Sequence, residues 1–368
     1  MCLPLHKTII LESSPGFSDN TKYVFDEMIL RKINDHYRIY WMIPDYKHFK
    51  SHKQKNVHFI NPKSIKAKYI RLTAQYIIDS NSYIKKLRKK QFRIHLSHGA
   101  QLKLPDAYIK EIGLFDYYTT IGKFFVPICS KIYSTKGKSI VVTGFPRNDG
   151  FFNDKHSTLF PNIRRKRTII WMPTYRNHKN AASTSIHTGI TFPYGIPCIN
   201  SQSDLLRLNT VLEKTHTLLV LKLHPMEKTD NISSLKLSNI RLFNDTILKN
   251  GQIQLYDLLK DFDALITDYS SVYYDFLLAR KPIGLAIPDL DEFTNNCKLI
   301  SKNYKDYIKG NYLYGVKDLI DFINNISSGT DPAKKDMEWA LNRYHAYQDG
   351  NSSKRVVDLL VKEMEKNK

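Results

Sequence analysis

The sequence predicts an α/β protein made of two doubly wound domains, each with a parallel sheet covered on both faces. Short apolar runs rich in β-branched residues alternate with longer amphipathic stretches, which is typical of buried parallel strands and the helices between them. The runs form two sets, separated by the polar stretch 153–167. The 368 residues also exceed the roughly 250 residues that one core usually supports.

The expected strands follow the apolar runs in order. The first domain, residues 1–155, is expected to contain Lys7–Leu11, Tyr37–Ile43, Val57–Ile60, Arg93–Leu96, Tyr117–Ile121 and Ser139–Val142. The second domain, residues 156–368, is expected to contain Thr168–Met172, Leu218–Leu223, Ile240–Phe243, Ala264–Thr267 and Ile283–Ile287. Its last helix is expected to be able to cross back to the first domain. Because ligands of such sheets bind beyond the carboxyl ends of the strands, functional residues are sought there.

Positive charge is concentrated in the first domain. The chain has a net charge of +21, and residues 1–155 hold 27 Lys and Arg against 12 Asp and Glu. Fourteen basic residues and one acid lie between Lys47 and Arg93, a density that attracts the phosphates of nucleic acid or of an anionic bilayer. Apolar residues in this segment have spacings that a helix can gather into a stripe: Tyr69, Tyr76, Ile77, Ile78, Tyr83, Ile84 and Leu87. We interpret the segment as a membrane-docking surface, with a solvated basic face over an ordinary core helix as the alternative.

Several classes of protein are disfavoured by composition. The four cysteines lie far apart without a CxxC pair, so neither a zinc site nor a disulfide framework is indicated. No apolar run approaches the roughly 20 residues of a membrane-spanning helix, and the N-terminus turns polar too soon for a secretory signal. We therefore expect a cytoplasmic protein, peripheral on the inner face of the cell membrane.

Polar residues follow five of the expected strands, in the segments SHGAQ, TGFPRND, PTYR, KLHP and TDYSS. Together they supply imidazoles, guanidinium groups, an ammonium group and hydroxyls, a combination suited to phosphate chemistry. His98 precedes a glycine that permits a sharp turn, and it is a candidate general base. His224 precedes Pro225, which restricts its backbone, so it suits a fixed phosphate ligand or proton donor next to Lys222. Arg147 and Arg176 can each bind a phosphate through two hydrogen bonds. The alternative for each of these candidate residues is a purely structural role.

The stretch LITDYSSVYYDF, residues 265–276, begins as a buried strand and ends as a helix. If Asp268 or Ser270 caps a helix that starts near Ser271, its free amides and dipole form a seat for a diphosphate. Asp275 lies one helical turn after Ser271, and from there it can reach a ribose or substrate hydroxyl. Plain N-capping would explain one Ser or Asp, but not the whole cluster.

These motifs together resemble the CDP-glycerol glycerophosphotransferase family, whose members make teichoic acids and related capsule polymers. The resemblance rests on the HG of His98, GFPR, PTYR, KLHP, LITDYSSVYYDF with the following KP, and the closing segment YQDGNSSKRVVDLL. It implies a GT-B-type fold of two Rossmann-like domains facing a cleft. Where family members commonly read HGTP, this chain has Ala100 and Gln101 after Gly99, so we expect the contacts of that loop to differ.

The resemblance also implies roles for particular residues. The CDP-alditol donor would be contacted by Gly99, Arg147, Pro173, Thr174, Arg176, Lys222, Leu223, Ser270, Ser271 and Asp275. His98 and His224 would be catalytic. His98 would deprotonate an acceptor hydroxyl, which attacks the β-phosphorus of CDP-glycerol or CDP-ribitol and releases CMP. The acceptor would be lipid-linked or polymeric. No cofactor is required by the sequence, and Mg²⁺ is compatible with it.

Other functions stay open at the level of sequence. A GT-B sugar-nucleotide glycosyltransferase would share the architecture, and a nucleic-acid-binding protein would explain the charge but not the His and Ser residues at the strand ends. A non-catalytic membrane scaffold would not need either histidine. The residues leave glycerol and ribitol, primase and polymerase, and teichoic acid and capsule synthesis equally open.

Overall fold

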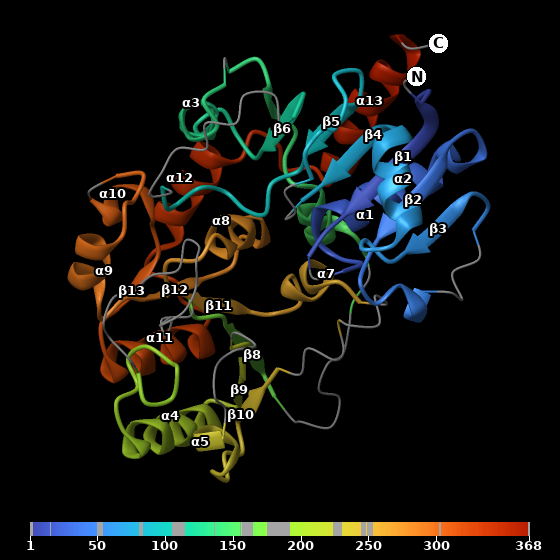
Figure 1. The fold of residues 1–368 in the computed structure, drawn as a ribbon. Coiled ribbons are helices and arrows are strands. Elements are labelled where there is room, and N and C mark those ends of the chain that lie inside the picture. The colour runs from blue at the N-terminus through green and yellow to red at the C-terminus, as the bar shows by residue number, and fades with distance from the viewer. Residues whose placement is uncertain are drawn as a thin grey trace.

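The computed structural model describes residues 3–14, 16–49, 54–80, 84–104, 115–135, 137–154, 156, 165–174, 192–223, 230–243, 248, 253–301 and 303–366. The described residues form two parallel sheets with helices on both faces (Figure 1). This is the α/β arrangement expected from the alternating runs. Residues 155 and 156 fall between the last strand of the first sheet and the first strand of the second.

The first sheet has the order β3-β2-β1-β4-β5-β6-β7. Its strands are β1 (His6–Glu12), β2 (Arg38–Met42), β3 (Val57–Ile60), β4 (Ala74–Asp79), β5 (Phe92–His95), β6 (Tyr117–Thr120) and β7 (Ile140–Val142). Its helices are α1 (Asp19–Leu30), α2 (Ile65–Thr73) and α3 (Phe125–Ile132), with short 3₁₀ turns at η1 (Ile33–Asp35), η2 (Tyr46–Phe49) and η3 (Pro146–Phe152). Helix α2 packs on one face of the sheet through Ala67 and Ile70. The other face packs on α1 through Val24, Phe25 and Met28.

The second sheet has the order β10-β9-β8-β11-β12-β13. Its strands are β8 (Arg167–Trp171), β9 (Thr217–Leu221), β10 (Ile240–Leu242), β11 (Ala264–Thr267), β12 (Ile283–Ala286) and β13 (Asn311–Leu313). Helices α4 (Gln202–Lys214), α5 (Asp230–Ser233), α7 (Leu255–Leu259), α8 (Val272–Phe276), α9 (Leu290–Asn296), α10 (Tyr304–Tyr307), α11 (Val316–Ser328) and α12 (Lys334–Tyr344) belong to this half, with η4 (Leu277–Ala279) after α8. All eleven expected strands are present, with ends within two residues of the predicted ones.

The expectation that Tyr76, Ile77 and Ile78 continue an amphipathic helix is wrong. Helix α2 ends at Thr73, and the following AQYIID forms β4, which pairs with β1 and β5. The segment is central in the sheet and these three side chains are buried, so β-branched and aromatic residues there suit a strand covered on both faces. Tyr83 lies outside the described residues.

The last helix, α13 (Ser352–Lys366), returns to the first domain and packs beside α1. Figure 1 shows it in red among the blue elements of that domain. Its apolar residues Val356, Val357, Leu360 and Met364 belong to the same buried cluster as Val24 and Met28. Residues far apart in the sequence therefore complete one core.

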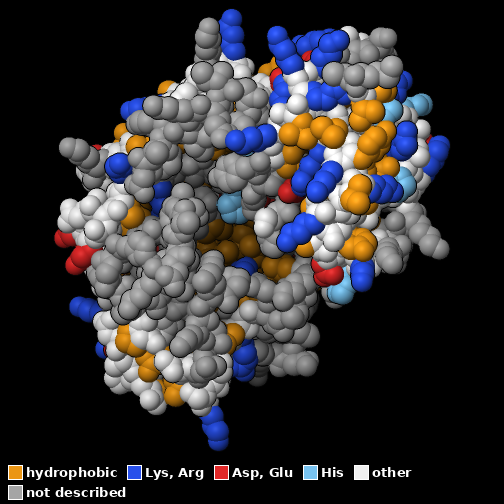
Figure 2. All heavy atoms as spheres, viewed as in Figure 1, with side chains coloured by type: hydrophobic (Ala, Val, Ile, Leu, Met, Phe, Trp, Pro, Cys, Tyr) orange, Lys and Arg blue, Asp and Glu red, His pale blue; other side chains and the backbone are white. Residues whose placement is uncertain are grey.

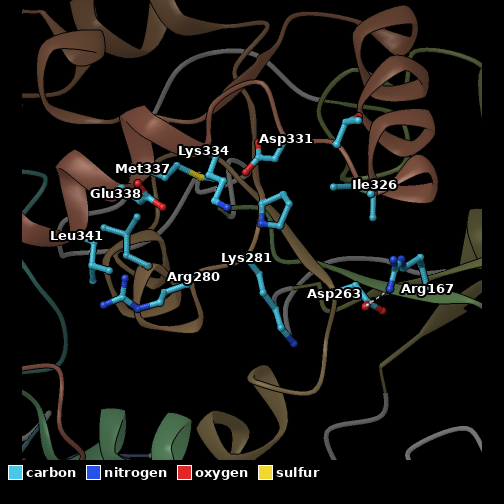
Figure 3. A pocket seen from close by; sticks show the side chains of 14 residues that line it. Arg167, Asp263, Arg280, Lys281, Ile326, Asp331, Lys334, Met337, Glu338 and Leu341 are labelled. Atoms are coloured by element: carbon cyan, nitrogen blue, oxygen red, sulfur yellow. Dashed lines mark hydrogen bonds and ion pairs between the residues drawn. The ribbon is translucent and has the colours of Figure 1, made fainter.

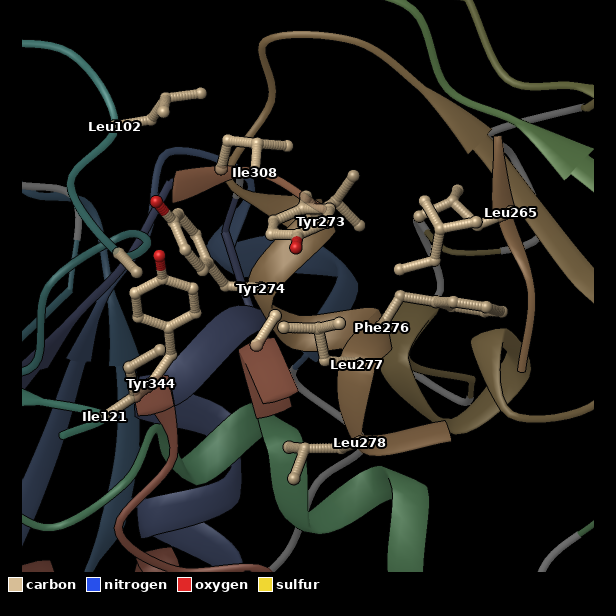
Figure 4. Close-up of a cluster of buried hydrophobic side chains, with 14 of the residues drawn as sticks. Leu102, Ile121, Leu265, Tyr273, Tyr274, Phe276, Leu277, Leu278, Ile308 and Tyr344 are labelled. Carbon is tan, nitrogen blue, oxygen red and sulfur yellow. The ribbon is translucent and has the colours of Figure 1, made fainter. Parts of the chain in front are cut away.

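A third buried cluster joins the two halves. It includes Leu102 and Ile121 from the first domain and Tyr273, Tyr274 and Tyr344 from the second (Figure 4). Backbones approach closely here, since a Cβ at Gly122 would lie 2.0 Å from the Tyr344 carbonyl oxygen. The interface therefore contains a packed apolar core of its own.

Candidate active site

The carboxyl ends of strands from both sheets meet at a cluster of charged side chains. Asp19 opens α1 after β1, His98 follows β5, and Arg147 lies in η3 after β7. Asp275 is on α8, which follows β11 of the second sheet. A hydrogen bond between His98 and Asp19 and ion pairs of Arg147 with Asp19 and Asp275 link all four side chains. The cluster thus joins the two domains through polar contacts. Figure 2 shows the molecule hollowed between its two halves.

Arg147 bridges the two domains from a buried position. Its Nη1 donates to Asp19 Oδ1 at 2.9 Å, and its Nη2 donates to Asp275 Oδ2 at 2.7 Å. The guanidinium also lies 4.5 Å above the Tyr256 ring. Burial alone would lower the pKa of Arg147, but the negative charges of Asp275 and Asp19 outweigh it and raise that pKa. The predicted phosphate ligand is therefore engaged by two carboxylates in this structure.

Asp275 is fully buried, and its contacts run toward the first domain. Its Oδ2 accepts hydrogen bonds from Arg147 and, at 3.1 Å, from the Tyr256 hydroxyl. Burial raises the pKa of Tyr256, which keeps that hydroxyl a donor. Asp275 Oδ1 and Arg147 Nε have no hydrogen-bond partner among the described residues. Both side chains therefore retain unused bonding capacity.

His98 faces outward beside Asp19. The His98 side chain is 70% exposed, and its Nδ1 lies 3.2 Å from Asp19 Oδ2, whereas the Asp19 side chain is only 8% exposed. Burial would raise the pKa of Asp19, but Arg147 and His98 outweigh it and lower that pKa to about 2. Ser97 and Asp19 both have positive φ angles, of 64° and 59°, a left-handed conformation that is uncommon outside glycine and frequent at functional sites.

Gly99 lets the His98 loop touch the second domain. A Cβ at this position would lie 2.3 Å from Ser271 Oγ, so a larger residue would push the two loops apart. The loop departs from the family's HGTP pattern at Ala100 and Gln101. Ala100 is buried, and Gln101 Nε2 donates to the Tyr118 hydroxyl at 3.1 Å.

Thr267 and Asp268 tie β11 to its neighbour β8. Thr267 Oγ1 donates to the Met172 carbonyl at 2.9 Å. The buried Asp268 carboxylate accepts hydrogen bonds from Thr174 N at 3.0 Å, Thr174 Oγ1 at 2.5 Å and Tyr269 N at 2.6 Å. Asp268 therefore shapes the Pro173–Thr174 turn and does not cap α8.

Ser270 and Ser271 precede α8, which begins at Val272 and has five residues. Val272 N lies 3.5 Å from Ser270 Oγ, so any side-chain cap is weak. Both serines are partly exposed, and Ser271 touches Gly99 as described above. The predicted phosphate seat thus lies within contact of the His98 loop.

The remaining predicted residues lie at neighbouring strand ends or outside the described residues. The Lys222 amide donates to the Trp171 carbonyl at 2.8 Å, and its Nζ lies 5.5 Å from the Phe243 ring centre. Leu223 is buried, and Pro173 is partly exposed. Arg176 and His224 lie outside the described residues.

Two other motif residues have contacts away from the strand-end cluster. The Asp149 carboxylate accepts hydrogen bonds from Ser352 N and Ser353 N, both at 2.8 Å, at the start of α13. Lys281 of the KP pair donates to the carbonyls of Lys260 at 2.5 Å and Phe262 at 2.7 Å. It also lines a cavity of about 430 Å³ (Figure 3). Because Asp263 and Pro282 of that cavity precede β11 and β12, the cavity lies at the opposite edge of the sheet from the predicted donor residues.

Sequence reasoning missed Asp19, Asn20 and Tyr256. The first two follow β1 in the polar segment FSDNT, so the rule that polar residues follow functional strand ends could have found them. Tyr256 lies within the short helix α7, and nothing in its local sequence marks it. Among the described residues, no group of three or more His, Cys, Asp or Glu side chains is placed to hold a metal ion. No helix in the described part of the chain is long and apolar enough to cross a membrane.

Comparison with known families gives a match over almost the whole chain. The model of the family described as CDP-Glycerol:Poly(glycerophosphate) glycerophosphotransferase matches residues 1–362. A teichoic acid ribitol-phosphate primase of Bacillus spizizenii is 26% identical over 67% of this chain and 59% of its own length. The teichoic acid ribitol-phosphate polymerase TarL of Staphylococcus aureus is 23% identical over 94% of this chain and 60% of its own length. The chain thus spans about three fifths of the length of these two relatives.

Solved structures show the same fold. The wall teichoic acid polymerase TagF, as its H548A variant, superposes with a TM-score of 0.75 at 17% identity, covering 98% of this chain and 90% of that one. A putative UDP-N-acetylglucosamine 2-epimerase from Listeria monocytogenes superposes with a TM-score of 0.55 at 13% identity, covering 97% of each chain. The two-domain architecture is of the GT-B type, as the motif resemblance implied.

Proposed function

The chain belongs to the CDP-glycerol:poly(glycerophosphate) glycerophosphotransferase family, and on that premise we propose that it is an alditol-phosphate transferase. It transfers glycerol phosphate, or a related alditol phosphate such as ribitol phosphate, from a CDP-alditol to a hydroxyl of a lipid-linked or polymeric acceptor. CMP is released, and the product belongs to teichoic acid or capsule polymer synthesis.

One contact carries the proposal. Gly99, beside the candidate base His98, packs against Ser271 of the candidate phosphate seat. These residues come from different domains and from segments more than 170 positions apart in the sequence. Their contact brings a proton acceptor and a set of hydroxyl donors to one place, which is what transfer between two bound substrates requires.

The reaction follows from the groups present. His98 accepts the proton of the acceptor hydroxyl, the oxygen attacks the β-phosphorus of the donor, and the bond between that phosphorus and CMP breaks. Ser270, Ser271 and Lys222 lie at the strand ends where the diphosphate would be held, and His224 would stabilise the charge on CMP. Arg147 Nε and Asp275 Oδ1 are buried and have no hydrogen-bond partner among the described residues, and we assign them to a phosphate oxygen and a donor hydroxyl. Such transfers depend mainly on positioning and charge neutralisation.

Release of CMP tests the proposal. The purified protein is incubated with CDP-glycerol or CDP-ribitol and a membrane extract as acceptor, and CMP is measured. We expect one of these donors to yield CMP and His98→Ala to reduce the rate by about 10²-fold or more. His36→Ala, at an exposed histidine in the first domain, should behave as the wild type.

Two outcomes of this assay would contradict the proposed function. If neither donor gives CMP above the His98→Ala level, the proposed function is wrong. Release of UDP from UDP-sugars would favour the glycosyltransferase alternative.

We also propose that the first domain docks on an anionic membrane, at the inner face where a lipid-linked acceptor is available. Here the basic–apolar surface denotes Lys63, Ile65, Lys66, Lys68, Tyr69, Leu72, Lys85, Leu87, Lys89 and Lys90, all of which are exposed. Arg88 donates to the Leu72 carbonyl at 3.4 Å, so the segment 84–91 lies beside α2. Apolar side chains among lysines suit an interface of acyl chains and anionic headgroups.

A further inference from the structure

We propose that Asp19 is the positioning residue of His98: its carboxylate keeps the imidazole proton on Nδ1 and leaves Nε2 free to accept the proton of the acceptor hydroxyl. The inference rests on the proposed function, because it assigns a partner to the base of that reaction. The contacts around Asp19 carry the inference.

The chemistry of the pair fixes the direction of the hydrogen bond. Asp19 Oδ2 lies 3.2 Å from His98 Nδ1. An ionised carboxylate can only accept hydrogen bonds, so Nδ1 must carry the proton. The lowered pKa of Asp19, about 2, keeps the group ionised throughout the neutral range. In neutral His98 the lone pair is then on Nε2, on a ring that is 70% exposed and open to an acceptor.

The carboxylate is itself held in place. Its second oxygen, Oδ1, accepts a hydrogen bond from Arg147 Nη1 at 2.9 Å. That same Nη1 also donates to the His98 carbonyl at 2.6 Å. Arg147 therefore holds both the Asp19 carboxylate and the backbone of His98, the residue that Asp19 orients. Rotation of the Asp19 side chain would break its hydrogen bond with Arg147 or its hydrogen bond with His98.

Asn20 fixes the backbone on the other side. Its Nδ2 donates to the carbonyls of Leu96 and Ser97, at 3.3 and 3.0 Å, and its Oδ1 accepts from Arg147 N at 3.0 Å. The start of α1 is thus joined to the strand end that bears His98. Asp19, directly before Asn20, has a positive φ of 59°, a strained conformation of the kind that clusters at functional sites.

The charges of the cluster favour the reaction as well. Arg147 contributes one positive charge, and Asp19 and Asp275 contribute two negative charges. Of these charges, the Asp19 carboxylate is the one in contact with the ring, at 3.2 Å from Nδ1, and it lies where an imidazolium would form when Nε2 takes a proton. The proton on Nδ1 stays on the ring throughout, so Asp19 orients and stabilises without exchanging a proton.

The substitution Asp19→Asn tests this role with little change in shape. Asparagine tolerates the left-handed backbone at this position. Its amide oxygen must face the Arg147 donor, which turns its amide nitrogen toward His98 Nδ1. Nδ1 then has to accept, the ring proton moves to Nε2, and the base is blocked. We expect kcat for CMP release to fall about 10²- to 10⁴-fold, with KM for the CDP-alditol changed by about twofold or less.

A matched control is available on the same helix. Asp26 pairs with Lys22 at 2.5 Å on the surface of α1, and Asp26→Asn should leave both kcat and KM unchanged. The ring tautomer can also be read without turnover, from two-bond ¹H–¹⁵N correlations of ¹⁵N-histidine-labelled protein. We expect the signal that disappears in His98→Ala to show a protonated Nδ1 in the wild type and a protonated Nε2 in Asp19→Asn.

The outcomes separate this inference from the proposed function. A wild-type spectrum with the proton on Nε2 would overturn the inference even if Asp19→Asn failed to fold. Wild-type kcat in Asp19→Asn, together with lost activity in His98→Ala, would overturn only the role of Asp19. Retained CMP release in His98→Ala would remove the proposed base and its positioning residue together.

Discussion

At the scale of single residues, Asp268 shows how a polar side chain can act on a site through the backbone. Among the described residues, its carboxylate accepts hydrogen bonds from Thr174 N and Thr174 Oγ1 on the neighbouring strand end and from Tyr269 N. Hydrogen bonds to a buried charged group are worth roughly 1.5–3 kcal/mol each. The polar cluster TDYSS therefore divides into two parts: Thr267 and Asp268 join strands, and Ser270 and Ser271 face the other domain.

Replacing Asp268 by Asn should weaken donor binding. The amide nitrogen would face a backbone N–H or the Thr174 hydroxyl proton, so at least one of the three hydrogen bonds would be lost and the Pro173–Thr174 turn would loosen. We expect KM for the CDP-alditol to rise about tenfold, which corresponds to about 1.4 kcal/mol. Steady-state kinetics of CMP release would measure it.

Thr267→Val is the control for Asp268→Asn. It removes another side-chain hydrogen bond between the same two segments, to the Met172 carbonyl, and should cost about 1 kcal/mol of stability without changing KM. Equal KM values in Asp268→Asn and the wild type would show that Asp268 has no part in shaping the donor site.

At the scale of elements, the GFPRND loop and the closing segment YQDGNSSKRVVDLL act together to dock α13. Asp149 caps the amides of Ser352 and Ser353. Gly144, with φ of 77°, leaves room for Ser352, whose Oγ would lie 2.3 Å from a Cβ. Arg355 forms an ion pair with Asp349 and donates to the Thr143 carbonyl at 3.3 Å. Two motifs separated by about 200 residues thus contact each other and hold the start of α13 in place.

Loss of the Asp149 cap should destabilise the protein. Asp149→Ala leaves two amides of α13 without their acceptor, and removal of an N-cap typically costs about 0.5–2 kcal/mol. We expect a lower thermal midpoint and faster proteolytic removal of α13, followed by differential scanning fluorimetry and limited proteolysis.

Asp358→Ala provides the comparison on the same helix. Asp358 forms an exposed ion pair with Arg31, and such pairs contribute about 0–1 kcal/mol. If Asp149→Ala were no less stable than Asp358→Ala, the cap would not hold the helix.

At the scale of the whole molecule, positive charge is concentrated on the first domain, which suits association with an anionic membrane surface. The basic–apolar surface covers α2 and the segment beside it, and Figure 2 shows blue and orange side chains intermixed on one half of the visible face. Each Lys or Arg near an anionic bilayer contributes about 1 kcal/mol.

Charge reversal tests the docking. The double substitution Lys66→Glu, Lys68→Glu should weaken binding to vesicles that contain anionic phospholipid about tenfold or more in a co-sedimentation assay. The double substitution Lys317→Glu, Lys335→Glu makes the same change in net charge at exposed positions of the second domain, and it should have little effect. Equal weakening in both variants, or tighter binding to DNA than to vesicles, would contradict the proposal.

The sequence predicted most strands correctly because a strand that is buried on both faces consists of a continuous run of apolar residues, which can be recognised locally. Ile9 and Leu265 lie in continuous apolar runs of that kind. The strand β4 was missed because Tyr76, Ile77 and Ile78 follow a true helix without a break in composition, and nothing local marks Thr73 as its end. The three-residue edge strand β13 is too short to leave a pattern.

The site was predicted unevenly for a related reason. His98, Arg147 and Ser271 could be assigned to strand ends because each follows an apolar run. Their partners could not be assigned, because Arg147 meets Asp19 and Asp275 at a sequence separation of 128 residues on either side. Such pairings depend on how two sheets face each other, and no local pattern encodes that.

The return of α13 also affects the order in which the chain can fold during synthesis. Val356, Val357, Leu360 and Met364 fill one face of the first domain, yet they leave the ribosome after the whole second domain. Domains usually fold as they emerge, from the N-terminus onward. Here the first domain must wait with the apolar face of α1 uncovered until residue 364 has been added, and that interval is when a chaperone would be most useful to it.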